Sequence, residues 1–106
     1  MNEEQKRQRL VEFLDQKAFD PILSQSAGKY RGHDRKIFED VKKSTESEKR
    51  RFHDNYHTAK DVRDNYLSDL NSRTAQKKNR ELEELGLPRL PQFRDEFMDL
   101  CERLGL

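Results

Sequence analysis

Histidine and acidic side chains recur at helical spacing near the middle of the chain, where they could bind a metal ion. His53, His57 and Asp61 follow one another at four-residue steps, which would place three possible ligands on one face of an unbroken helix. Thr58, however, has the chemistry of a helix N-cap, which would end the helix near His57 and turn Asp61 away. The chain has no HExxH sequence, and its only acid-x-x-His pair is Asp54 with His57. We therefore predict no metal site and no cofactor.

Arg51 and His57 are the residues that could support catalysis without a metal. In the segment RFHDNYH they match an Arg-x(4–6)-His spacing, and the segment resembles the motif of the HEPN ribonucleases, which are small and all-α. The resemblance covers seven residues and implies that the arginine and histidine would act on the RNA phosphate and its 2′-hydroxyl. That family usually has a polar residue directly after the arginine, where this chain has Phe52. We predict no catalytic residue and no enzyme, and keep a metal-independent ribonuclease as the third hypothesis.

The composition favours a small folded domain built from helices. Of the 106 residues, 41% are charged and 31% hydrophobic, but the formal net charge is only +1. Disorder usually requires low hydrophobicity together with high net charge. Three valines and two isoleucines are too few to build a sheet. We predict one all-α domain over residues 1–106, a compact orthogonal or irregular bundle of about five short helices joined by short turns.

Apolar spacing predicts the elements of the first half of the chain. A helix covers about residues 3–18, and Pro21 limits it, with Asp20 marking a turn. Residues 24–32 have no apolar periodicity and form a loop. Residues 34–56 form either one helix or two, because the run KKSTESEKRR contains no large apolar residue and includes the Thr-x-x-Glu form of a capping box.

Capping residues predict the helices of the second half. Thr58 would cap one helix, and Ser72 would end it or cap its successor. Gly86 would close that successor, and residues 86–91 would form a connector rich in leucine and proline. Pro91 suits the first turn of the last helix.

The sequence also predicts where the protein is found. The N-terminal sequence MNEEQKRQRLVEFL has no apolar run of the length that a signal peptide needs, and no window approaches a membrane span. The single cysteine, Cys101, cannot form an internal disulfide. We expect a soluble protein of the reducing cytoplasm, without membrane association.

Charge is segregated along the chain, which indicates two basic segments that could bind nucleic acid. Residues 29–51 and 71–80 each carry a net charge of +4, whereas residues 81–106 carry −4. The basic segments could contact phosphates if they share one face, which the sequence does not settle. The candidate contacts are Arg35, Lys36, Lys42, Lys43, Lys49, Arg50, Arg51, Arg73, Lys77, Lys78 and Arg80.

The acid-rich last helix suggests a protein partner instead. Its apolar side chains, with Phe97 and Met98 among them, could leave an apolar strip for a partner helix or a second copy to cover. Marginal small domains often gain stability in this way. Our leading hypothesis is a non-enzymatic domain that acts through protein–protein interaction or self-association. A nucleic-acid-binding accessory protein is the alternative.

Overall fold

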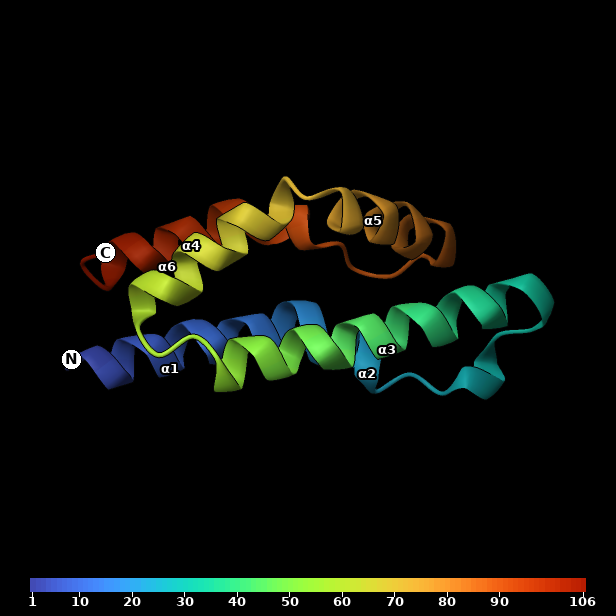
Figure 1. Ribbon diagram of the computed structural model, residues 1–106, viewed down its shortest axis with the longest axis horizontal. Coiled ribbons are helices and arrows are strands. Elements are labelled where there is room, and N and C mark those ends of the chain that lie inside the picture. Colours follow the sequence, from blue (N-terminus) through green and yellow to red (C-terminus); the bar gives the residue numbers. More distant parts are fainter.

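Helices make up most of the chain in the computed structural model, which describes residues 1–106 (Figure 1). The α-helices are α1 (Glu3–Leu14), α2 (Asp20–Leu23), α3 (Gly32–Asp54), α4 (Ala59–Leu70), α5 (Arg73–Leu85) and α6 (Arg94–Arg103). A π-helical turn, η1 (Asp15–Phe19), joins α1 to α2, and two 3-10 turns, η2 (Ala27–Lys29) and η3 (Leu90–Phe93), precede α3 and α6. The chain has no strand, so the predicted all-α bundle is confirmed.

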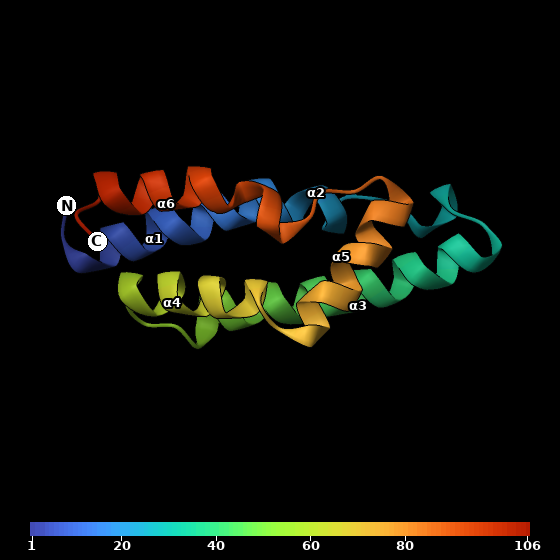
Figure 2. The same cartoon turned by 90° about the horizontal axis from the view of Figure 1, so that it is seen from above.

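The helices form two layers that share one long axis. Figure 1 shows α1 and α3 in one layer and α4, α5 and α6 in the other, and Figure 2 shows that α6 lies over α1. α4 also packs against α1, and α5 packs against α3. The bundle measures 47 × 21 × 19 Å. Both chain termini lie at the same end of the long axis, and the connection between η2 and α3 lies at the far end.

Two apolar clusters of unequal size hold the layers together. The main core contains 15 buried residues, drawn chiefly from α1, η1, α4 and α6, and lies toward the end that carries the termini. The distal core contains only Ile22, Phe38, Val41 and Leu82, and joins α2, α3 and α5. The far half of the bundle is therefore held by few apolar contacts.

The first helix does not end in a turn before Pro21, so that prediction is wrong. The backbone stays helical through η1 into α2, and Asp20 has φ −64° and ψ −36°. Pro21 occupies the first turn of α2, where a residue without an N–H group is tolerated. Ile22 follows it into the distal core, so burial of this side chain favours the continued helix.

Residues 34–56 belong mainly to one long helix, which decides between the two alternatives. α3 has 23 residues and is continuous through Thr45. Thr45 does not cap a new helix, because it is buried and its hydroxyl donates a hydrogen bond to the carbonyl of Val41 at 2.8 Å. The polar stretch stays helical because Thr45 and Glu48 both turn toward the other helices.

The predicted caps of the later helices are confirmed. The Thr58 hydroxyl accepts a hydrogen bond from the backbone N–H of Asp61 at 3.0 Å and so caps α4. Ser72 caps α5 through the N–H of Ala75, also at 3.0 Å. Gly86 ends α5 with φ 71°, a left-handed conformation that favours glycine.

None of the helices combines the length and the apolar composition that crossing a bilayer would require.

Candidate interaction surfaces

The predicted apolar strip on the last helix is covered by the rest of the chain. Phe97 is fully buried, with its ring centroid 4.3 Å from that of Tyr66 on α4 and 5.9 Å from that of Phe13 on α1. Met98 is partly buried and packs against the main core. Phe97 is therefore a core residue, and its prediction as a partner contact is wrong. The spacing of apolar residues along the last helix does not predict that α1 and α4 cover Phe97.

Five of the eleven predicted nucleic-acid contacts are held by neighbouring groups. Four of these five residues form ion pairs: Arg35 with Glu39 at 3.0 Å, Lys49 with Asp20 at 2.8 Å, Arg51 with Asp69 at 3.6 Å, and Lys78 with Glu48 at 3.3 Å. The ammonium of Lys42 donates to the carbonyl of Gln25 at 3.3 Å. The other six cations are exposed and form no ion pair: Lys36, Lys43, Arg50, Arg73, Lys77 and Arg80.

Glu48 and Lys78 form a buried ion pair between α3 and α5. Burial raises the pKa of Glu48 and lowers that of Lys78, because both charged forms lose hydration, while their mutual attraction opposes each shift. Arg51 and Asp69 border the same polar cavity of about 260 Å³. Two buried oxygens of this cluster, Glu48 Oε1 and Asp69 Oδ2, accept no hydrogen bond. Lys78 therefore links two helices and is not available to a partner.

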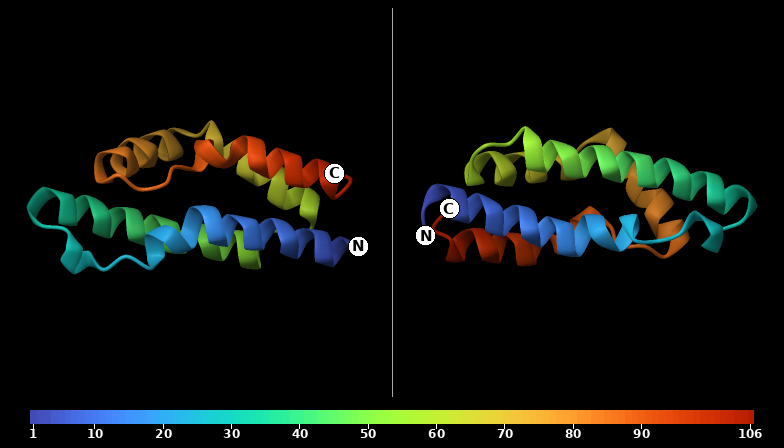
Figure 3. Two further views of the ribbon diagram at one scale, coloured as in Figure 1. Left: turned by 180° about the vertical axis from the view of Figure 1, so that it is seen from behind. Right: turned by 90° about the horizontal axis from the view of Figure 1, so that it is seen from below.

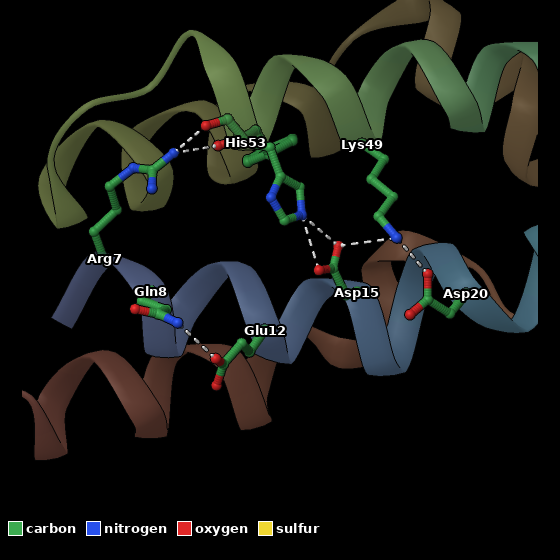
Figure 4. A network of polar contacts seen from close by, with 8 residues as sticks. Arg7, Gln8, Glu12, Asp15, Asp20, Lys49 and His53 are labelled. Atoms are coloured by element: carbon green, nitrogen blue, oxygen red, sulfur yellow. Dashed lines mark hydrogen bonds and ion pairs between the residues drawn. The ribbon is translucent and has the colours of Figure 1, made fainter. Parts of the chain in front are cut away.

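A second polar cluster joins the π-helical turn to α3 (Figure 4). His53 Nε2 lies 2.8 Å from a carboxylate oxygen of Asp15, and Lys49 Nζ lies 2.8 Å from Asp20 and 4.0 Å from Asp15. The hydrogen bond with Asp20 contributes most to raising the pKa of Lys49. These contacts fix the irregular turn η1 against α3, which is a structural role.

The histidines considered for metal binding or catalysis do not assemble into a site. His53 is held by Asp15, whereas His57 is exposed and makes no hydrogen bond. The Arg51 guanidinium faces Asp69 and the hydroxyl of Tyr56. No group of three His, Cys, Asp or Glu side chains could hold a metal ion.

The six free cations form two rows on different sides of the molecule. Lys36, Lys43 and Arg50, here called the α3 row, are seven residues apart and exposed on α3. Arg73, Lys77 and Arg80, the α5 row, recur at four and three residues on α5. Helical spacing places each row opposite the buried face through which α3 and α5 contact each other. The two basic segments therefore do not share one face.

The α5 row has the more uniform charge. Exposed acids, including Glu39, Asp40 and Glu46, lie beside the α3 row on the same helix. In contrast, residues 71–80 contain no acid, and the first turn of α5 has none. The amino end of α5 adds the partial positive charge of a helix N-terminus. The outward face of α5 is thus cationic over residues 73–80, and the acids Glu81 and Glu84 follow on the same helix.

An acidic row of the same spacing lies on α6. Asp95, Asp99 and Glu102 recur at four and three residues, and all three are exposed. Asp95 lies 3.6 Å from its neighbour Arg94, and the other two form no ion pair. Sequence reasoning found the net negative charge of this segment but missed the row. Its spacing was readable, since residues at i, i+4 and i+7 share a helix face.

Comparison with known proteins finds no matching family model, no matching curated protein and no matching solved structure. The function has to follow from the charged surfaces described above.

Proposed function

We propose that this chain is a small non-enzymatic helical domain that acts through protein–protein interaction, with the α5 row binding an acidic partner. One observation carries the proposal: Arg73, Lys77 and Arg80 are exposed on one helix face and form no ion pair. The single, unpaired Cys101 supports a location in the cytoplasm.

The length of the α5 row suits an acidic helix. Arg73 and Arg80 are seven residues apart, which corresponds to about 10.5 Å along a helix axis. A partner helix with carboxylates at the same spacing can therefore face all three cations. Charges of this kind, at the rim of a contact, set the rate of encounter and the choice of partner more than they set affinity.

Nucleic-acid binding is the second candidate, and the six free cations support it. Its strength would depend on the number of phosphates neutralised at one time. The α3 and α5 rows lie on opposite sides of the α3–α5 pair, so one nucleic-acid strand or duplex would contact only one row closely. A formal net charge of +1 adds little long-range attraction. We therefore place nucleic acid after protein.

The test is a titration of isotope-labelled chain followed through its backbone amide shifts. The first titrant is a glutamate-rich helical peptide, and the second is a mixed pool of short RNA and DNA. The proposal expects the peptide to shift the amides around Arg73 to Arg80 in the wild type, and Lys77→Glu to abolish these shifts. Lys43→Glu makes the same charge change in the α3 row and serves as the matched control.

Three outcomes would count against the acidic partner. The peptide could leave the α5 amides unchanged, or Lys43→Glu could reduce binding as much as Lys77→Glu does. Stronger shifts with the nucleic-acid pool than with the peptide, decreasing at high salt, would make nucleic acid the preferred partner.

A further inference from the structure

The chain carries two exposed rows of opposite charge with identical spacing. The α5 row places cations at positions 73, 77 and 80, and the α6 row places carboxylates at positions 95, 99 and 102. Both sets follow the i, i+4, i+7 pattern of one helix face, so each row is about 10.5 Å long. When two helices lie alongside each other, three cations can face three carboxylates.

The two rows do not neutralise each other within one molecule. No ion pair joins α5 to α6, and the carboxylate of Asp95 pairs with Arg94 on its own helix. Figures 1 and 3 show α5 and α6 at opposite ends of the same layer, linked by the connector and η3. Apart from Asp95, the charges of both rows therefore have no ion-pair partner within the molecule.

We infer that the acidic partner of the α5 row is the α6 row of a second copy of this chain. The inference rests on the proposed function and names its partner. Charge complementarity supports it, because the cations and carboxylates are opposite in sign and match in number, spacing and exposure. Met98 lies between Asp95 and Glu102 on the same side of α6 and is partly exposed, which adds a small apolar contact beside the charges.

The expected association is weak and depends on salt. Exposed ion pairs contribute little individually, and salt screens them. Each copy carries both rows, so the contact either closes as a two-fold dimer or continues from copy to copy. In either form, association weakens as ionic strength rises.

The first experiment is sedimentation velocity of the full chain over a range of protein concentrations, at about 0.01 M and about 1 M salt, where the Debye lengths are about 30 Å and 3 Å. The inference expects concentration-dependent association at low salt and a monomer at high salt. A monomer at both salts overturns the inference. It leaves the proposed function to the peptide titration, which does not depend on self-association.

Reversing the charge at the centre of each row identifies the surfaces. Lys77→Glu and Asp99→Lys should each weaken the low-salt association by about tenfold, since each brings like charges together. The double variant, which carries both changes, should recover association, and so should an equimolar mixture of the two single variants. Lys43→Glu is the control, because it alters an exposed, unpaired cation outside both rows. Circular dichroism of each variant would check that the variant is folded.

Separate results overturn the inference and the proposed function. If the peptide shifts the α5 amides but Lys77→Glu and Asp99→Lys associate as the wild type does, the partner of the α5 row is not α6. If the double variant stays dissociated, the two rows do not meet each other. If the peptide also fails to bind, both the self-association inference and the proposed function are wrong.

Discussion

The ammonium group of Lys78 lies 3.3 Å from a carboxylate oxygen of Glu48, and each side chain is only 8% exposed. The pair crosses from α5 to α3 beside the small distal core, where few apolar residues hold the helices together. A buried ion pair loses much hydration energy on folding, so its presence says little about its net contribution to stability. Removing only one partner, however, leaves an unpaired buried charge and should destabilise the fold.

We expect Lys78→Ala to lower the free energy of unfolding by about 3–5 kcal/mol, because it leaves a buried carboxylate without its cation. Urea unfolding followed by circular dichroism measures this change. Lys77→Ala is the matched control, since Lys77 is exposed and unpaired; its effect should stay within about 0.5 kcal/mol.

Replacing both members of the pair separates the charge effect from the packing effect. The double variant Glu48→Met with Lys78→Met should be about as stable as the wild type, or more stable, because no buried charge remains. If it were as unstable as Lys78→Ala, lost packing rather than an unpaired charge would explain the single variant.

The same cluster should make stability depend on pH. Burial raises the pKa of Glu48 above its ordinary value of 4.5, so the folded chain holds this proton more tightly than the unfolded chain. The free energy of unfolding contributed by Glu48 therefore falls as pH rises from about 4.5 through the native pKa.

Glu48→Gln removes this titration, and its plot of unfolding free energy against pH should be flatter over that range. Burial also raises the pKa of Asp69, which acts in the same direction and remains in the variant, so the slope should decrease without disappearing. Urea unfolding at several pH values between about 4 and 8 provides the comparison. Parallel curves for the two proteins would show that Glu48 does not titrate differently on folding.

Local signals in the sequence predicted the helices and their ends well. Thr58, Ser72 and Gly86 act on backbone groups only a few residues away, so their chemistry is visible in a short window. The all-α class followed from the scarcity of β-branched residues. The course of the chain at Pro21 was missed, because the burial of Ile22 in the distal core is a long-range contact.

Surfaces were harder to predict than elements, since they depend on what packs over each helix. Phe97 belongs to an apolar stripe whether or not a neighbour covers it, and only the positions of α1 and α4 settle the question. Lys78 lies in a basic run, yet its partner Glu48 is 30 residues away. The candidate site could therefore be predicted as charge segments but not as exposed rows.

A buried hydroxyl ties α4 to the start of η3. The Tyr66 hydroxyl donates a hydrogen bond to the carbonyl of Leu90 at 2.7 Å, and burial raises the pKa of the phenol. Tyr66→Phe keeps the ring in the main core but leaves this carbonyl without its donor. We expect a loss of about 1–3 kcal/mol in unfolding free energy, measured by urea unfolding. An unchanged midpoint would mean that water replaces the hydroxyl.

The only cysteine should react slowly in the folded protein. Cys101 is buried in the main core, and burial raises the pKa of its thiol, so little reactive thiolate forms near neutral pH. A thiol-specific chromogenic reagent should label it slowly in buffer and rapidly in concentrated urea. Rapid labelling in buffer would show that α6 opens readily from the core.

Arg7 should stabilise the end of α3 from a distant part of the sequence. Its guanidinium donates to the carbonyl of Phe52 at 3.2 Å and to that of His53 (Figure 4). It also donates to the carbonyl of Tyr56. Carbonyl groups at a helix C-terminus lack partners within the helix, and a cation there also interacts favourably with the helix dipole.

Arg7→Met retains a long apolar side chain and removes the donors, so we expect a loss of about 1.5–3 kcal/mol in unfolding free energy. Arg7→Lys keeps the charge but loses the planar arrangement of donors, and should fall between Met and the wild type. Arg9→Met is the control, because Arg9 is an exposed arginine on the same helix. Equal effects at positions 7 and 9 would mean that the loss reflects net charge. A larger effect at position 7, with faster hydrogen exchange in the last turn of α3, would assign it to the cap.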